Sequence, residues 1–416
     1  MVNSLISTPF VNRDRLAQSI ARLAQIGQLP EGGVRRIAYS LEDIQARKFV
    51  QRWMVEFGMS VRIDAAGNII GRYPGKFPQA SALATGSHID TVPNGGRFDG
   101  AFGVLAGLEV VRVLSERQIQ LNHAFEVIVF TDEEGTMIGS KAMSGRVIDD
   151  SPYYRRPDGT DIQTCLERVG GNWNHINQAQ RSSRDINAFV ELHIEQGPIL
   201  ESMGKQIGVV EGVVGQRRYT ITVKGSSSHA GSTPMHMRQD ALVAASKVVL
   251  AVNRLANTPG QQVATVGSMQ VSPNAANVIP GLVEMSLDIR DLSNLHIDSL
   301  MEQLGLDIKA IAADTQTQIR LEPCLQNEPA PAKPHIQQTI VQVCEELGLS
   351  YTNVPSRASH DAQEIANFTD MGMIFVPSES GISHAETEYT SPEQCAQGAN
   401  VLLHTLLKLD QHYRCH

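Results

Sequence analysis

Three short polar clusters in the first third of the chain carry residue types that bind cations and move protons. The first contains His88 and Asp90, the second Asp99, and the third the adjacent pair Glu133 and Glu134. One imidazole with several carboxylates suits a divalent cation such as zinc, manganese or cobalt. The alternative is a set of solvated structural carboxylates. The adjacent glutamates favour a cation, because their charges repel unless a cation or a shared proton separates them.

Two buried strands are expected to deliver these clusters to one place. Apolar runs at 82–85 and 125–130 precede the first and third clusters, and residues 100–116 carry apolar side chains close to helical spacing. A strand, a helix and a strand in this order form a βαβ unit, whose parallel strands end at one edge of a sheet. Open parallel sheets bind ligands at that edge. With a cation there, one glutamate can ligate while the other acts as a general base on bound water.

The composition bounds the class of protein. A chain of 416 residues predicts two domains, or one domain with a large insertion. The formal net charge of −9 argues against a nucleic-acid partner. Residues 1–13 lack the pattern of a signal peptide, and no apolar run has transmembrane length. The five cysteines form no CxxC pair, so we expect reduced thiols and a cytoplasmic location.

The remaining pattern predicts a catalytic α/β domain interrupted by an insertion. Residues 214–328 show the order β-α-β-β-α-β of a ferredoxin-like α+β domain, and a proline-rich stretch at 328–334 follows. The flanking segments, 1–213 and 329–416, are expected to form one domain with a mixed, largely parallel sheet. Their expected elements are helices at 12–28 and 41–57, strands at 60–63, 69–73, 189–194 and 373–376, and two helices after His335. In the insertion we expect strands at 219–223, 263–271, 282–289 and 318–321, and helices at 240–255 and 295–313.

Several motifs carry a family resemblance. His88-Ile-Asp90-Thr-Val, Asp99-Gly100 and Glu133-Glu134-Gly135 resemble signatures of the co-catalytic metallopeptidase and aminoacylase superfamily. The resemblance narrows to its hydantoinase/carbamoylase branch, which includes N-carbamoyl-L-amino-acid hydrolases, β-ureidopropionase and allantoate amidohydrolase. The narrowing motifs are Glu191-Leu-His193-Ile-Glu-Gln196-Gly197, His229-Ala-Gly231-Ser-Thr-Pro234 and Gly381-Ile-Ser-His384. The resemblance covers nearly the whole chain and implies a zinc-aminopeptidase-like catalytic domain with an inserted lid and dimerisation domain.

The resemblance also implies two divalent metal ions per chain, with zinc preferred and manganese, cobalt or nickel as alternatives. His88 and His384 would each bind a different ion, and Asp99 would bridge the two. Glu134 and His193 would complete the opposite coordination spheres. Asp90 would orient the ring of His88 from outside the coordination sphere. Without the surrounding motifs, His193 or His384 would be interpreted as a hydrogen-bonded core histidine.

Catalytic and substrate-binding roles follow from the same resemblance. Glu133 would be the general base, and His229 would stabilise an oxyanion in the active site of a partner subunit, which implies a homodimer. The alternative for His229 is a surface loop histidine. Arg290 would bind a substrate carboxylate, with a salt bridge to a neighbouring aspartate as the alternative. Further substrate contacts are expected from Gln196, Gln216, Asn277 and the backbone around Gly381, and structural support from His360 and Asp361.

The implied reaction is hydrolysis of a C–N bond in a carboxylate-bearing ureido or N-carbamoyl compound by a metal-bridging water. A peptidase or deacylase of the same superfamily is the first alternative, and a non-catalytic metal-binding protein is the second. The segment 215–219 resembles allantoate amidohydrolases more than carbamoyl-amino-acid hydrolases, but the particular substrate stays open. Many relatives follow Glu-Glu-Gly with Arg-Phe and several more residues before Gly-Ser. Those residues are missing between Gly135 and Gly139, so the leaving-group side of the pocket is expected to differ.

Overall fold

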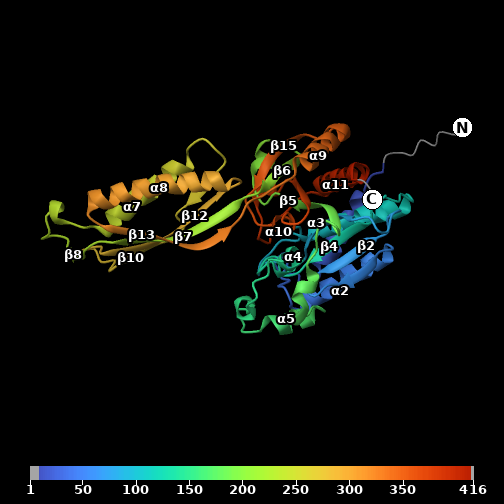
Figure 1. Ribbon diagram of the computed structural model, residues 1–416, viewed down its shortest axis with the longest axis horizontal. Helices are drawn as coiled ribbons and strands as arrows, with labels where there is room; N and C mark the ends of the chain where they lie inside the picture. The colour runs from blue at the N-terminus through green and yellow to red at the C-terminus, as the bar shows by residue number, and fades with distance from the viewer. Residues whose placement is uncertain (1–8, 414–416) are drawn as a thin grey trace. The chain divides into compact units, whose positions relative to one another are not determined.

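The computed structural model describes residues 9–413 and divides the chain into two compact units, whose course can be followed in Figure 1. The first unit runs to Val213 and resumes at Pro331, and the second unit spans Val214–Ala330. The sequence pattern predicted that the inserted unit ends at residue 328, two residues before the observed end at Ala330. Most of the N-terminal stretch 1–13 and the thiol of Cys415 lie outside the described residues.

The first unit is an α/β structure. Its longer helices are α1 (Arg13–Ala24), α2 (Leu41–Glu56), α3 (Ala101–Glu116), α9 (Pro334–Leu347) and α11 (Pro392–His412). Its shorter helices and turns are α4 (Ile138–Ser144), η1 (Ser151–Tyr154), α5 (Ile162–Arg168), η2 (Trp173–Ala179), α6 (Ile199–Ser202), α10 (Asp361–Ile365) and η4 (Glu379–Gly381). The helix expected at 12–28 ends early, at Ala24, and Gly27 beyond it has a φ of 84°.

One mixed sheet runs through the first unit. Its strands are β1 (Ser60–Ile63), β2 (Ile69–Tyr73), β3 (Ala82–His88), β4 (Phe125–Phe130), β5 (Ile186–Ile194), β6 (Ile207–Val213), β14 (Ala330–Pro331), β15 (Tyr351–Ser356) and β16 (Asp370–Val376). The order is β1-β2-β4-β3-β5-β16-β6-β14, with β15 paired to β6. The central pairs β4–β3, β3–β5 and β5–β16 are parallel, whereas β1–β2, β2–β4 and β16–β6 are antiparallel. The expected mixed, largely parallel sheet is confirmed.

The strand register places the expected chemistry at one edge. His88, the last residue of β3, lies opposite Phe130, the last residue of β4. His193 of β5 lies opposite Phe375 of β16. Because these strands are parallel, their carboxyl ends face the same way, and the loops that follow them meet.

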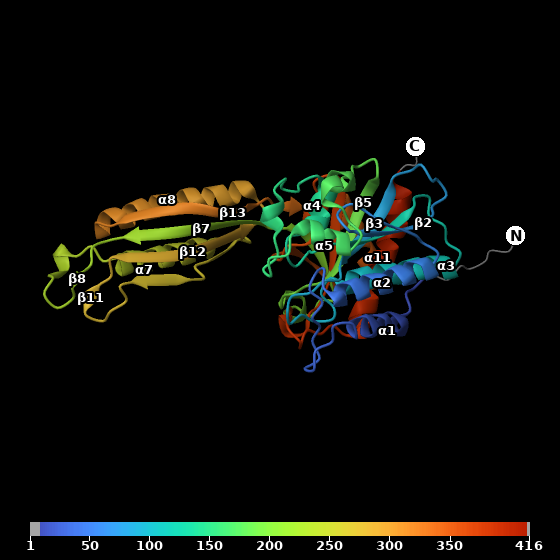
Figure 2. The ribbon, with the colours of Figure 1, turned by 90° about the horizontal axis from the view of Figure 1, so that it is seen from below.

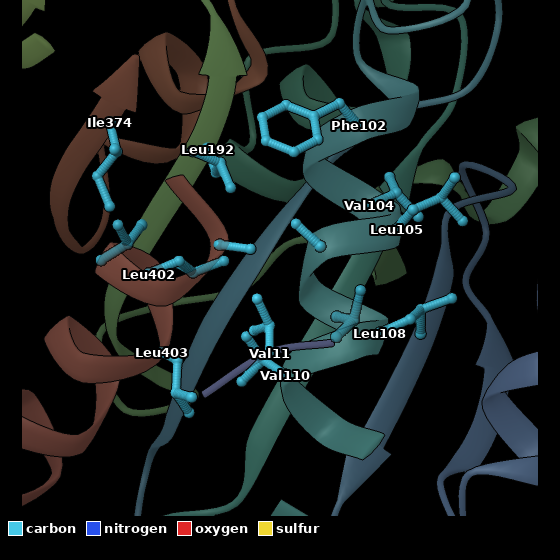
Figure 3. Packing of buried hydrophobic residues seen from close by; sticks show 14 of the residues in the cluster. Val11, Phe102, Val104, Leu105, Leu108, Val110, Leu192, Ile374, Leu402 and Leu403 are labelled. Carbon is cyan, nitrogen blue, oxygen red and sulfur yellow. The ribbon is translucent and has the colours of Figure 1, made fainter. Parts of the chain in front are cut away.

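Helix α3 packs its apolar side chains against the sheet and against α11. Figure 3 shows Phe102 and Leu105 of α3 in one core with Leu192 of β5 and Leu402 of α11. Close contact requires Gly103, since a Cβ there would come within 2.2 Å of the Leu192 carbonyl oxygen. Each fully buried large apolar side chain contributes about 1.5–3 kcal/mol, so this packing fixes the strands that carry the site.

The second unit has the ferredoxin-like order of elements. These are β7 (Gly215–Lys224), β8 (Ser228–His229), η3 (Met235–Met237), α7 (Ala241–Ala256), β9 (Val263–Thr265), β10 (Met269–Ser272), β11 (Val278–Ile279), β12 (Leu282–Asp291), α8 (Asn294–Thr315) and β13 (Gln318–Asn327). The sheet order is β10-β12-β7-β13, all antiparallel, with β9 also paired to β12. Both helices cover one face of this sheet (Figure 1), and β13, β7 and β12 run side by side in Figure 2.

Several elements differ from the sequence expectations. The single strand expected at 263–271 is two strands, β9 and β10, separated at 266–268. Strands β6 and β15 were not predicted, because β6 contains two glycines and β15 contains Pro355, which weaken a strand signal. The expected linker holds β14 and the first residue of α9, Pro334, whose fixed φ suits the start of a helix.

No helix among residues 9–413 is long and apolar enough to cross a membrane.

Candidate active site

Two groups of possible metal ligands share one carboxylate at the carboxyl edge of the first unit's sheet. The first group is His88, Asp99 and His193, and the second is Asp99, Glu134 and His384. Asp99 Oδ1 lies 3.1 Å from His193 Nε2 and 3.7 Å from His88 Nε2. Its other oxygen, Oδ2, lies 3.0 Å from His384 Nε2. The two oxygens of Asp99 therefore face different sets of ligands.

The ring orientations of two histidines are set by backbone carbonyls. His88 Nδ1 lies 2.9 Å from the carbonyl oxygen of Asp90, and His193 Nδ1 lies 2.9 Å from that of Ile194. When Nδ1–H donates to a carbonyl, Nε2 keeps a lone pair that can bind a metal. In this structure His193 Nε2 accepts the N–H of Gly100 at 3.1 Å. Gly100 is required beside them, because it has a φ of 61° and a Cβ there would lie 2.5 Å from the His88 ring.

The role expected of Asp90 is carried by its main chain, since its carboxylate oxygen is 3.9 Å from His88 Nδ1. The carboxylate instead accepts the backbone N–H groups of Glu133 at 3.4 Å and Glu134 at 3.2 Å. Burial and the charge of Asp132 raise the pKa of Asp90 to about 8. Asp90 thus links the loop after β3 to the glutamate pair after β4.

Glu133 lies inside the same cluster. Its Oε2 is 3.5 Å from His88 Nε2. Burial raises the pKa of Glu133 well above its ordinary value, and the nearby charges of Asp361 and Glu134 raise it further. A carboxylate in such surroundings holds a proton readily, which is the property that a general base needs.

The donor set fits divalent cations. Glu134 Oε1 is buried without a hydrogen-bond partner among the described residues, so an acceptor at the site has no protein donor. Burial raises the pKa of Glu134 to about 7. The hydrogen bond to Asp99 raises the pKa of His384 to about 9; His193 also reaches about 9, because Asp99 outweighs the lowering effect of burial. Without a metal ion, protons bound to these three side chains compensate the negative charge of the carboxylates, which a cation would otherwise do. Imidazole and carboxylate ligands together suit zinc, manganese, cobalt or nickel.

Two further expected residues lie at this cluster or next to it. Gln196 Nε2 donates to Asp99 Oδ2 at 3.0 Å, and Gln196 Oε1 is buried without a partner among the described residues. Gly381 packs against the segment after Gln196, since a Cβ there would come within 2.7 Å of the Pro198 nitrogen. The N–H of Gly381 donates to the carbonyl oxygen of Ser378 at 3.0 Å.

In the second unit, His229 and Asn277 lie together. Strand β8 pairs with β11, and the carbonyl oxygen of Asn277 accepts the N–H of Ala230 at 2.9 Å. Both residues are exposed. His229 Nδ1 accepts the N–H groups of Gly231 at 3.0 Å and Ser232 at 3.2 Å. A neutral ring with this acceptor pattern carries its proton on Nε2, which is then a free donor.

Gln216 and Arg290 form a separate pair in the second unit. They are cross-strand neighbours on β7 and β12. Arg290 Nε donates to Asp288 Oδ1 at 2.8 Å and its Nη2 to Oδ2 at 3.4 Å, while Gln216 also donates to Asp288. The salt bridge given as the alternative for Arg290 is therefore present in this structure.

The structure does not bring these two pairs together within one chain. Gln216 lies near the start of β7, and Lys224 at its end precedes His229 by five residues. From Gln216 to Lys224, eight residue steps of extended strand span ~26 Å at about 3.3 Å per residue. The His229 pair and the Arg290 pair therefore lie toward opposite ends of the second unit's sheet.

Sequence reasoning missed Glu388. Its Oε1 accepts the N–H groups of Phe98 at 2.9 Å and Asp99 at 3.1 Å, and its Oε2 accepts the hydroxyl of Ser383 at 2.8 Å. The side chain is buried. The only sequence signal is an acid four residues after His384, in a loop without periodicity. Glu388 holds the Asp99 loop in place.

A third group of possible ligands, Glu191, His193 and His360, adjoins the cluster. Glu191 already accepts the Ser87 hydroxyl at 2.7 Å and the Ala362 N–H at 2.9 Å. His360 Nε2 lies 2.9 Å from the Ser356 hydroxyl. These contacts favour structural support, the role expected of the His360 segment.

A sheet edge that gathers imidazoles and carboxylates around a shared aspartate defines a metal-dependent hydrolytic class of site. The chain belongs to the Peptidase family M20/M25/M40, whose model matches residues 84–408.

Three similar proteins place the chain more closely. The N-carbamoyl-L-amino acid amidohydrolase of Geobacillus stearothermophilus is 38% identical and is covered over 99% of its length by 96% of this chain. The allantoate amidohydrolase of Bacillus subtilis is 36% identical, with 95% of this chain and 98% of the relative covered. A hydantoinase/carbamoylase family amidase from Burkholderia multivorans superposes with a TM-score of 0.90 at 39% identity. The superposition covers 97% of this chain and 98% of the amidase. The expected family resemblance is confirmed.

Proposed function

We propose that the protein is a metal-dependent amidohydrolase that cleaves a C–N bond of a carboxylate-bearing ureido or N-carbamoyl compound. The observation that carries the proposal is the position of Asp99 between two groups of ligands, with the buried Glu133 beside them. The names of the full-length relatives support the substrate class. N-carbamoyl-L-amino acids and allantoate are both candidate substrates.

Two divalent ions would occupy the cluster. His88, Asp99 and His193 would hold one ion, and Asp99, Glu134 and His384 would hold the other. A shared carboxylate offsets the repulsion between neighbouring cations. Bound divalent ions polarise the scissile carbonyl and make water a stronger nucleophile. Zinc is the preferred ion, and manganese, cobalt or nickel would fit the same donors.

Glu133 would act as the general base. It belongs to neither group of ligands containing Asp99, and its Oε2 lies 3.5 Å from His88 Nε2. Its raised pKa suits a group that takes a proton from the attacking water and delivers it to the leaving nitrogen. Glu134, held by the same backbone contacts to Asp90, would remain a ligand.

His229 would donate its Nε2–H to the oxyanion that forms in the tetrahedral intermediate. The acceptor role of its Nδ1 supports this tautomer. Gln216 lies at the start of β7, whereas His229 lies beyond its far end. This separation supports a site to which two subunits contribute residues. We therefore propose a homodimer in which His229 and Asn277 serve the site of the partner chain.

Arg290 and Gln216 would bind the carboxylate of the substrate. A guanidinium can meet both oxygens of a carboxylate, as Arg290 meets Asp288 here. A substrate carboxylate would compete with Asp288 or share the guanidinium with it. Gln196, with its unpartnered Oε1 at the cluster, would contact the substrate near the metal ions.

Release assays test this function. Metal-loaded protein should release ammonia and carbon dioxide from N-carbamoyl-L-amino acids or from allantoate, and should cleave dipeptides and N-acetyl amino acids poorly. Efficient cleavage of peptides without turnover of any ureido acid would contradict the proposal. The expected cytoplasmic location is part of the same proposal, and cell fractionation tests it.

A further inference from the structure

A cavity of about 420 Å³ opens beside Glu134, and residues of the first unit line it. Its walls come from the segments 37–38, 90–93, 132–136 and 154–157. Small-ligand sites in proteins have volumes of about 300–1,000 Å³. Because Glu134 is a proposed metal ligand, a group held in this cavity would lie next to the bond that is cleaved.

Several charged groups in the cavity wall already have partners. Asp132 accepts the guanidinium of Arg156 at 2.8 Å and the hydroxyl of Thr136 at 2.6 Å. Gly135 must lack a side chain here, because a Cβ would lie 2.4 Å from Asp132 Oδ1 and 2.9 Å from Arg156 Nη1. Asp90 accepts the backbone N–H groups of the glutamate pair. These contacts fix the wall and give Asp90 and Asp132 partners, while Glu134 Oε2 lies 3.5 Å from His384 Nε2.

Arg155 is the exception. Its side chain lines the cavity, is exposed and has no ion pair among residues 9–413. Its neighbour Arg156 is fixed by Asp132 and by backbone hydrogen bonds with Gly159 and Thr160, both at 2.9 Å. The charge of Arg155 contributes to lowering the pKa of the exposed Asp161, but no hydrogen bond or ion pair engages the Arg155 side chain among residues 9–413. The guanidinium is therefore a cation on a fixed segment whose N–H donors can still bind a ligand.

The rest of the lining includes apolar groups, namely Ile37, Ala38, Val92 and Pro93. An apolar wall beside a cation whose N–H groups are not hydrogen-bonded suits a substituent that has a short hydrocarbon stem and an anionic end. This cation is distinct from Arg290, which belongs to the second unit.

We propose that this cavity is the subsite for the substituent on the α-carbon of an N-carbamoyl amino acid, and that Arg155 selects a substituent ending in a carboxylate. The inference rests on the proposed function and deepens it, because it assigns the substrate class as N-carbamoyl derivatives of dicarboxylic amino acids.

A matched pair of compounds tests this inference. N-carbamoyl-L-glutamate and N-carbamoyl-L-glutamine differ in one charge and hardly in size. For metal-loaded wild-type protein, kcat/KM should favour the glutamate compound by about three- to fivefold, the upper range for an exposed charge pair. The preference should vanish in Arg155→Gln, persist in part in Arg155→Lys, and shrink as salt concentration rises.

The control variant is Arg62→Gln, which removes the same charge from an exposed position on β1, outside the cavity lining. It should keep the wild-type preference. Equal kcat/KM values for both compounds in wild type, or a preference that Arg155→Gln leaves unchanged, would overturn the inference. If neither compound is hydrolysed, that result contradicts the proposed function. Dissociation constants for the same compounds, measured by calorimetry, then decide the subsite by the same comparison.

Discussion

Glu388 accepts a hydrogen bond from the backbone N–H of Asp99 at 3.1 Å, across 289 residues of chain. The same carboxylate accepts the N–H of Phe98 and the hydroxyl of Ser383. Glu388 thus ties the loop that presents Asp99 to the segment that presents His384. The shared carboxylate depends on a residue that we do not place among the metal ligands.

Replacing Glu388 should therefore weaken metal binding. Loss of a residue that supports a ligand typically costs about 10- to 100-fold in metal affinity, and we expect this from Glu388→Ala in chelator competition. Glu388→Gln should lose less, because an amide oxygen can still accept the two N–H groups. Glu386→Ala, at an exposed neighbouring position, is the control.

Elemental analysis of wild type should find more than one ion per chain; a single ion would contradict the two-ion proposal.

Glu133→Gln should keep the fold and the metal ions but lose most of the activity. The substitution preserves shape and removes the proton acceptor, whose contribution is typically about 10²–10⁴-fold in rate. Steady-state kinetics and elemental analysis on one preparation check both parts. Turnover close to that of wild type would mean that the roles of Glu133 and Glu134 are wrongly assigned.

Mixing two inactive variants tests whether His229 serves a partner subunit. His229→Ala and Glu133→Gln should each be nearly inactive alone. In a mixed dimer one site would combine the intact Glu133 of one chain with the intact His229 of the other. Random exchange should then restore roughly a quarter of wild-type activity, since half of the dimers are mixed and each has one intact site. No recovery despite proven exchange of subunits would place His229 in its own chain's site or outside catalysis.

Arg290→Lys should raise the KM for carboxylate-bearing ureides. An ammonium cannot meet both carboxylate oxygens as a guanidinium does, and a charge-assisted contact is worth about 1.5–3 kcal/mol. We expect about a tenfold increase in KM, because Arg290 is partly exposed. Arg218→Lys is the control, since Arg218 also pairs with Asp288. The carboxylate-anchor role fails if wild type hydrolyses amide-capped substrates as well as free acids.

Metal-free protein should lose stability as the pH rises from about 5 to about 9. The pKa of Asp90 is raised to about 8 and that of Glu134 to about 7, chiefly by burial, and that of His193 reaches about 9 through Asp99. A raised pKa means that the folded protein binds the proton more tightly than the unfolded chain does. The resulting stability is fully present below the unfolded pKa values and is lost as the pH rises through the folded ones.

Thermal unfolding with a chelator at pH 5.5, 7 and 9 checks this dependence. Protein saturated with zinc or manganese should show a smaller decline or the opposite trend, because a metal ion replaces the protons and binds better as they leave. Metal-free protein that is more stable at pH 9 than at pH 5.5 would contradict the prediction.

The sequence by itself determined the sheet edge and the types of residue that gather there. The apolar runs before His88 and before the glutamate pair specify buried strands, and the intervening helix makes those strands parallel. These features depend on neighbours in the chain, so local pattern is enough to predict them.

Only the tertiary structure decided which atoms meet. The backbone carbonyl of Asp90 contacts the His88 ring, whereas its carboxylate accepts backbone N–H groups of the glutamate pair. Glu388 reaches Asp99 from the other end of the chain, and Asp288 occupies the guanidinium of Arg290. Each of these contacts depends on how strands and loops pack and on the direction in which a side chain leaves the backbone. Neither can be predicted from hydrophobic periodicity.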